Sequence, residues 1–131
     1  MVKKFETRHV PSQYDDIAPD DSEIRLLVKL EGGSMSHCTL PPQRISQAVR
    51  HQTVEELWYF VQGCGQVWRR QGDMEEVVDV RPGVSMSIPV GVHFQFRNTG
   101  WERLCFIIVT MPPWPGEEEA VKEKNHWEVD E

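Results

Sequence analysis

Residues 49–63 read VRHQTVEELWYFVQG, and residues 83–98 read GVSMSIPVGVHFQFRN. Each segment combines β-branched and aromatic residues with glycine or proline at its turns, which is the pattern of strands joined by tight connections. Gly63, after the EELWYFVQ run, suits a turn with positive φ, and Pro89 with Gly91 suits a sharp corner between two strands. The two segments therefore predict an all-β fold.

The same rhythm continues outward from these segments through most of the chain. Short apolar runs alternate with glycine and proline, and no stretch repeats the i, i+3, i+4, i+7 spacing of an amphipathic helix. The sequence predicts a sandwich or barrel with low helix content. The expected strands cover residues 24–30, 34–40, 45–51, 56–61, 66–70, 75–80, 84–88, 93–97 and 103–110.

The 131 residues fit one domain with a segment of different composition at each end. Residues 1–22 are polar and acidic, and we expect an extended N-terminal arm. Residues 23–110 form the predicted barrel. Residues 111–131 are rich in proline and then in charge, but Trp114 and Trp127 would be unfavourable as exposed surface. We therefore expect this C-terminal tail to dock on the barrel.

The two quoted segments resemble the paired motifs of the cupin family. Glu56 and Gly63, with six residues between them, match the first motif, and His51 falls on the second histidine of its HxH pair. Gly83, the Pro-x-Gly at 89–91 and Asn98 match the second motif. The resemblance spans roughly residues 32–110 and implies a double-stranded β-helix, or jelly-roll, barrel.

In typical cupins three histidines and one glutamate point into the barrel and bind a divalent metal, and the resemblance implies this site here. Val49 replaces the first histidine and Phe94 the third, while His93 lies one residue before the third position. Of the four ligand positions that the resemblance implies, only His51 and Glu56 carry a residue that can bind a metal. Because side chains alternate between the faces of a strand, His93 becomes a ligand only if a bulge shifts the register. Two ligands predict that an ion such as Zn, Mn, Ni or Fe binds weakly or is absent.

The same alternation predicts which side chains line the interior. An inward carboxylate in apolar surroundings needs a histidine, an arginine, a metal or a raised pKa, so His51 and Glu56 are the candidate catalytic pair. The remaining predicted pocket residues are Val49, Trp58, Phe60, Phe94 and Phe96.

Three functions remain open from the sequence. The leading hypothesis is a small-molecule-binding cupin whose pocket centres on His51 and Glu56, with an unknown ligand. The second is a metal-dependent or acid–base enzyme of isomerase, epimerase or dioxygenase type acting on a small sugar, hydroxy acid or keto acid, with His51 as base. The third is a non-catalytic structural or regulatory dimer. Fold alone does not choose among them.

The amino-acid composition limits the kinds of partner that we expect this protein to bind. The net charge of −7 and the absence of a basic run argue against nucleic acid. The longest apolar run is too short to span a membrane, and the N-terminus lacks a signal-peptide pattern, so we expect a cytoplasmic protein with three reduced cysteines.

Both faces of the strand at residues 56–61 are apolar, so the side chains of Leu57, Tyr59 and Val61 also need to be covered. This predicts a homodimer.

Overall fold

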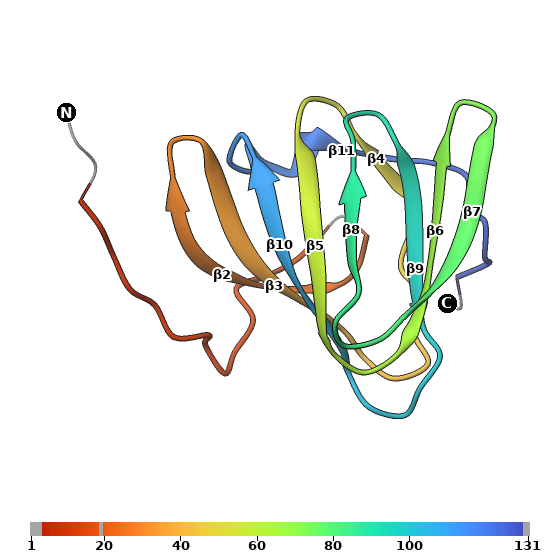
Figure 1. Cartoon of the computed structure of the whole chain (residues 1–131), viewed down its shortest axis with the longest axis horizontal. Helices are drawn as coiled ribbons and strands as arrows, with labels where there is room; N and C mark the ends of the chain where they lie inside the picture. Colours follow the sequence, from red (N-terminus) through yellow and green to blue (C-terminus); the bar gives the residue numbers. More distant parts are fainter. Residues whose placement is uncertain (1–3, 19, 130–131) are drawn as a thin grey trace.

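The computed structural model describes residues 4–18 and 20–129. These residues form two antiparallel sheets that enclose one core (Figure 1). The six-stranded sheet runs β1 (Asp16–Ile17), β2 (Glu23–Leu30), β3 (Gly33–Leu40), β10 (Leu104–Met111), β5 (Glu55–Gln62) and β8 (Ser85–Ile88). The five-stranded sheet runs β11 (Ala120–Lys122), β4 (Val49–His51), β9 (His93–Asn98), β6 (Gly65–Gln71) and β7 (Met74–Val80).

The all-β prediction with low helix content is confirmed. The one helical element among the described residues is the short 3-10 helix η1 (Glu117–Glu119). No helix in the part of the chain that the structure describes is long and apolar enough to cross a membrane.

One predicted strand is too long. The sequence favoured a strand over residues 45–51, but β4 covers only its last three residues. Ile45 makes a single isolated bridge with Arg97, and the Ser46 hydroxyl accepts the Phe96 backbone N–H at 3.0 Å. The backbone before β4 is therefore held by a bridge and a side-chain contact instead of a continuous ladder. The short strands β1 and β11 were not expected, because they lie in the segments assigned to the arm and the tail.

Strand β5 shows most clearly how the sequence builds the core. Its alternate residues Glu56, Trp58 and Phe60 are buried, whereas Leu57, Tyr59 and Val61 are exposed. The indole of Trp58 lies 4.6 Å from the Phe106 ring, 5.1 Å from that of Phe94 and 5.7 Å from that of Phe96 between centroids. Such aromatic pairs contribute about 0.5–1.5 kcal/mol each beyond burial of their area. The middle of the barrel is thus filled by rings.

The turn after β5 depends on a glycine. Gly63 has φ +79°, and a Cβ built there would collide with the backbone carbonyl of Arg103. A larger residue would therefore meet both backbone strain and a close neighbour, which is why glycine suits this position.

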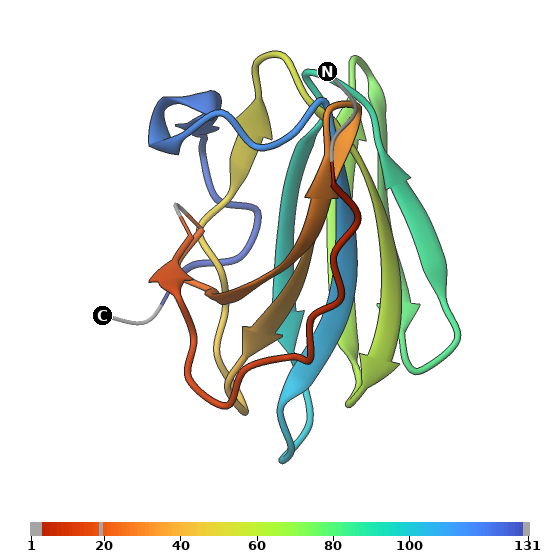
Figure 2. The same cartoon turned by 90° about the vertical axis from the view of Figure 1, so that its left-hand side faces the viewer.

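The N-terminal arm is extended, and its residues 8–17 contact β2 (Figure 2). The Arg25 guanidinium donates to the carbonyls of Pro11 at 2.9 Å and Ser12 at 3.1 Å. The Asp15 carboxylate accepts the Leu26 backbone N–H at 2.8 Å. These contacts fix the arm along the outer edge of the six-stranded sheet.

The C-terminal tail lies against the five-stranded sheet. Strand β11 pairs with β4, and further along the fully buried Gln95 on β9 holds the tail by its amide. Its Nε2 donates to the Trp127 carbonyl at 2.8 Å, while its Oε1 accepts the backbone N–H groups of His126 and Trp127, each at 2.8 Å. One glutamine side chain thus replaces a strand partner for the tail backbone.

Candidate functional site

Glu56 places a carboxyl group inside the barrel, on the buried face of β5. Its Oε1 accepts the Trp58 indole N–H at 3.0 Å, and its Oε2 accepts the Thr110 hydroxyl at 2.6 Å. Burial raises the pKa of Glu56, and the hydrogen bonds from Thr110 and Trp58 oppose that shift without cancelling it. Both oxygens therefore already have a protein donor.

His51 lies beside this carboxyl group on β4 and is also buried. Its Nδ1 is 3.9 Å from Glu56 Oε1, which is too far for a hydrogen bond. Among the described residues this Nδ1 is the buried side-chain nitrogen or oxygen without a hydrogen-bond partner. Burial lowers the pKa of His51, which favours the neutral imidazole.

Two further carboxylates approach His51 from segments outside the central strands. Asp20 and Glu119 both oppose the lowering of the His51 pKa by their negative charge. Asp20 Oδ1 accepts the Ser22 hydroxyl at 2.5 Å, and burial raises the pKa of Asp20. Glu119 accepts the backbone N–H of Thr53 at 2.6 Å. The surroundings of His51 are therefore acidic.

Sequence reasoning missed Asp20 and Glu119 as neighbours of the site. Asp20 was assigned to the arm, and Glu119 is one of three consecutive glutamates in η1. Neither position carries a local signal of burial, because each is brought inward by the path of its segment.

Trp114 covers the imidazole from the tail. Its ring centroid lies 5.2 Å from that of His51 at an interplanar angle of 72°, and Phe94 contacts His51 at 5.1 Å with the same angle. The imidazole therefore lies between the Phe94 and Trp114 rings, and Trp114 reaches the surface, since it is 37% exposed. Its backbone N–H donates to the Ser34 hydroxyl at 3.2 Å. Trp114 thus separates His51 from solvent at this end of the barrel.

The structure brings the other predicted pocket residues together in the core. All are buried, and Trp58 contacts the rings of the three phenylalanines directly. The interior at these positions is therefore filled by side chains. The predicted pocket residues placed in the core are Val49, Trp58, Phe60, Phe94 and Phe96.

His93 lies on the other face of β9, away from His51. It pairs across the ladder with Arg50, while its neighbour Phe94 pairs with Val49. Its Nε2 is 3.9 Å from the Glu123 carboxylate, and its Nδ1 is 3.4 Å from the Arg70 guanidinium. The register shift that would make His93 a ligand does not occur in β4 or β9.

The protein is thus a two-sheet antiparallel barrel with a buried carboxyl group and an imidazole between the sheets. The family model for the cupin domain matches residues 36–110. The chain belongs to the cupin family. A search of curated proteins finds no match.

Solved structures share the fold at low identity. BH2720 from Bacillus halodurans has 19% identity and a TM-score of 0.65, covering 79% of this chain and 76% of its own. Oxalate decarboxylase from Bacillus subtilis, which has Mn(II) centers, has 13% identity and a TM-score of 0.70, covering 85% of this chain and 30% of its own. The capsular polysaccharide assembling protein CapF from Staphylococcus aureus has 20% identity and a TM-score of 0.65, covering 80% and 32%. The chain thus spans about a third of the latter two proteins.

The residues at the site do not fit a divalent metal. Val49 and Phe94 stand at two of the four positions where the family resemblance implies ligands, and they offer no donor atom. Both oxygens of Glu56 accept protein hydrogen bonds. Within residues 4–18 and 20–129 no group of three or more His, Cys, Asp and Glu side chains is arranged to hold an ion. A metal normally needs at least three such ligands.

Proposed function

We propose that this cupin binds a small neutral molecule bearing a hydroxyl group, at the end of the barrel where His51 and Glu56 face each other. The observation that carries the proposal is the buried, unpartnered Nδ1 of His51, 3.9 Å from Glu56 Oε1. An unsatisfied buried polar atom costs about 1–3 kcal/mol. A group that bridges the two atoms would recover that free energy.

A hydroxyl group has the right chemistry for this gap. It can donate to Glu56 Oε1 and accept from a protonated Nδ1 of neutral His51, or donate to Nδ1 and accept from a protonated Glu56. A water molecule offers the same pattern in the free protein, and a ligand hydroxyl would displace it.

The charges around the imidazole favour a neutral ligand over an anion. Asp20 and Glu119 act on His51 as negative charges, and Glu56 adds a third carboxyl group. A carboxylate ligand would meet these groups without a cationic partner, because burial favours the neutral form of His51. This argument separates the proposal from the hydroxy-acid and keto-acid substrates considered from the sequence.

A second candidate is acid–base catalysis on the same hydroxyl group. Burial raises the pKa of Glu56 and lowers the pKa of His51, so the two values move toward each other. Moving a proton from Glu56 to His51 through a bridging hydroxyl then has a smaller energetic penalty. In this function His51 Nδ1 accepts the hydroxyl proton while protonated Glu56 donates its own proton to the same oxygen, so that the hydroxyl group is restored.

The test is an NMR titration that observes the His51 imidazole nitrogens and, in every variant, the indole N–H signals of Trp58 and Trp114, which lie beside the site. Ethylene glycol and glycerol serve as neutral probes and sodium acetate as the anionic probe, with His51→Ala and His93→Ala as the test and control variants. We expect the neutral probes to shift the His51 signals in the parent and in His93→Ala, and His51→Ala to weaken binding of those probes at least tenfold. A response to acetate alone, or to none of the three, would contradict the proposal.

A further inference from the structure

The tail crosses one end of the barrel before it reaches the five-stranded sheet. Residues 112–118 join Met111, the last residue of β10, to Glu119, the last residue of η1 (Figure 2). We call this stretch the crossing segment. Near its middle, Trp114 places its ring 5.2 Å from the His51 imidazole between centroids. The crossing segment therefore covers the end of the barrel at which we propose that a ligand binds.

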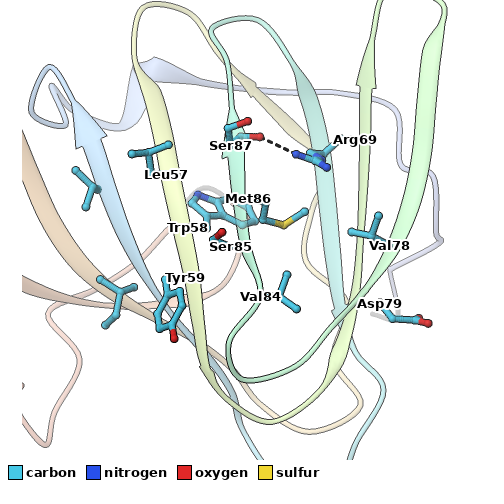
Figure 3. A pocket seen from close by; sticks show the side chains of 12 residues that line it. Leu57, Trp58, Tyr59, Arg69, Val78, Asp79, Val84, Ser85, Met86 and Ser87 are labelled. Atoms are coloured by element: carbon cyan, nitrogen blue, oxygen red, sulfur yellow. Dashed lines mark hydrogen bonds between the residues drawn. The ribbon is translucent and has the colours of Figure 1, made fainter.

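A ligand cannot reach the proposed site unless a side chain moves. His51 is 4% exposed and Glu56 is 5% exposed, so both are shielded from solvent. A hollow of about 700 Å³ indents the surface where β8 faces the other sheet, and neither residue lines it (Figure 3). Trp58 is among the residues that line this hollow, and its indole N–H donates to Glu56 Oε1 at 3.0 Å. Entry from the hollow would therefore require Trp58 to move.

The two tryptophans on the possible routes differ in how firmly they are packed. Trp58 is 2% exposed and contacts four phenylalanine rings of the core. Trp114 is 37% exposed, and within the described residues its aromatic contact is with His51. Displacing Trp58 would leave a cavity among the rings, whereas displacing Trp114 would move a partly exposed ring further into solvent. The route past Trp114 therefore has the lower energetic cost.

The middle of the crossing segment is lightly held. Before it, Met111 still pairs with Glu55 in the ladder between β10 and β5. Within it, the Trp114 backbone N–H donates to the Ser34 hydroxyl at 3.2 Å. Gly116 has φ +146°, a conformation that glycine adopts readily, and a Cβ built there would meet no described atom within 4 Å. The segment can therefore rotate near Gly116 without breaking a strand pairing.

The C-terminal end of the crossing segment is anchored by Glu119, which is 6% exposed. Its carboxylate accepts the Thr53 backbone N–H at 2.6 Å, the Thr53 hydroxyl at 2.5 Å and the Val54 backbone N–H at 3.1 Å. Hydrogen bonds to a charged acceptor are roughly twice as strong as neutral ones. Gln52 adds two more, from its backbone N–H to the Glu119 carbonyl at 3.1 Å and from its side chain to the Glu118 carbonyl at 2.7 Å. The crossing segment is therefore fixed to the loop between His51 and β5.

From these observations we infer that the crossing segment is a lid, which lifts Trp114 off His51 to admit a ligand and is held shut by the Glu119 carboxylate. The inference rests on the proposed ligand site, since a closed site needs an entrance. Opening breaks the hydrogen bond to Ser34 and the ring contact with His51, while the pairing of β10 and of β11 is kept. Glu119 is thus a positioning residue that acts on the site through Trp114.

The rate at which diethyl pyrocarbonate modifies His51 in the full chain measures how often the lid is open. It is followed by mass spectrometry of the His51 peptide at mildly alkaline pH, where the imidazole is neutral in every variant. Glu119→Ala removes the anchor and should raise the rate about fivefold. Glu119→Gln keeps an acceptor oxygen and should bring the rate back to within about twofold of the parent. Glu117→Ala is the matched control, because Glu117 lies exposed in the same turn, and it should leave the rate unchanged.

A double variant separates a lid from a general loosening of the barrel. In the Trp114→Ala background no ring remains to be lifted, so adding Glu119→Ala should not raise the rate further. An equal acceleration in both backgrounds, or a Glu119→Ala variant that is folded by circular dichroism and reacts like the parent, would overturn the inference. If Glu119→Ala does not fold, Thr53→Val removes one donor to the carboxylate and should raise the rate about twofold, and a rate equal to that of the parent would overturn the inference instead. Neutral probes that fail to bind in the NMR titration would refute the proposed ligand without altering these rates, so the two failures are distinguishable.

Discussion

The two faces of strand β5 serve opposite purposes. On the inner face Glu56 is buried with its oxygens hydrogen-bonded, and Trp58 and Phe60 pack among other rings. On the outer face Leu57 and Tyr59 remain half exposed. The comparison shows that this chain completes its own interior, except at His51 Nδ1, but leaves an apolar exterior uncovered. Substitutions on each face should therefore affect different properties.

The largest expected effect is on the inner face. Trp58→Ala should lower the free energy of unfolding by about 3–5 kcal/mol, because it leaves a cavity among the rings. Val61→Ala, on the outer face of the same strand, should lower it by less than about 1 kcal/mol. Urea denaturation of both variants measures the difference. Equal losses would mean that the two faces of β5 are not distinguished by packing.

Removing the buried carboxyl group should have the next largest effect. Glu56→Ala leaves the Trp58 indole N–H and the Thr110 hydroxyl without their acceptor. The free energy of unfolding should fall by about 2–3 kcal/mol. Glu56→Gln retains one acceptor oxygen and should lose about half as much. An alanine variant as stable as the parent in urea denaturation would show that these hydrogen bonds are readily replaced.

The fold and the alternation of β5 could be predicted from the sequence, because the spacing of Gly63 and Pro89 and the period-two pattern are local properties. The neighbours that reach His51 from the arm and the tail could not be predicted. Asp20, Trp114 and Glu119 come from segments without periodic burial, and their side chains reach the site only through contacts distant in sequence. His51 and Glu56 were predicted as the candidate pair, but their 3.9 Å separation depends on how the two sheets pack.

Protonation of His51 should reduce stability at acidic pH. Its pKa in the folded protein lies below the usual 6.5, so the unfolded chain binds the proton first as the pH falls. The contribution of His51 is therefore complete above pH 6.5 and is lost as the pH drops through the lowered value. The free energy of unfolding should change by at most about 1.4 kcal/mol per pH unit because of this one group.

Urea denaturation across this pH range should show that His51→Gln has a smaller acid-side loss than the parent, with the exposed His9→Gln as control. Glu56 acts in the opposite direction, because its raised pKa makes the folded state lose stability as the pH rises above the usual 4.5. A parent and His51→Gln variant with parallel pH profiles would contradict a neutral buried imidazole.

Trp114 should control access to the imidazole more than it controls stability. Trp114→Ala removes a ring that is already partly exposed, so the loss of stability should be about 1 kcal/mol or less. His51 should then react several-fold faster with diethyl pyrocarbonate, as followed by mass spectrometry of the His51 peptide. Trp101→Ala is the control, since Trp101 is exposed and is not among the ring contacts of His51. An unchanged rate at His51 would show that Trp114 does not cover it.

The smallest expected effect is that of a chelator. Because two ligands bind an ion only weakly, brief treatment with EDTA should change the Tm by less than about 1 °C. Elemental analysis should find that His51→Ala abolishes any residual metal and that His93→Ala leaves it unchanged. Metal that survives chelation, or that disappears in His93→Ala, would indicate a site organised around the outward histidine.

The most direct test of the account is a crystal structure of the protein soaked with ethylene glycol. We predict a hydroxyl oxygen within about 3 Å of both His51 Nδ1 and Glu56 Oε1, beneath the Trp114 ring. A structure in which Nδ1 instead bonds directly to a protein group, with no ligand oxygen between the two side chains, would contradict the proposed binding site.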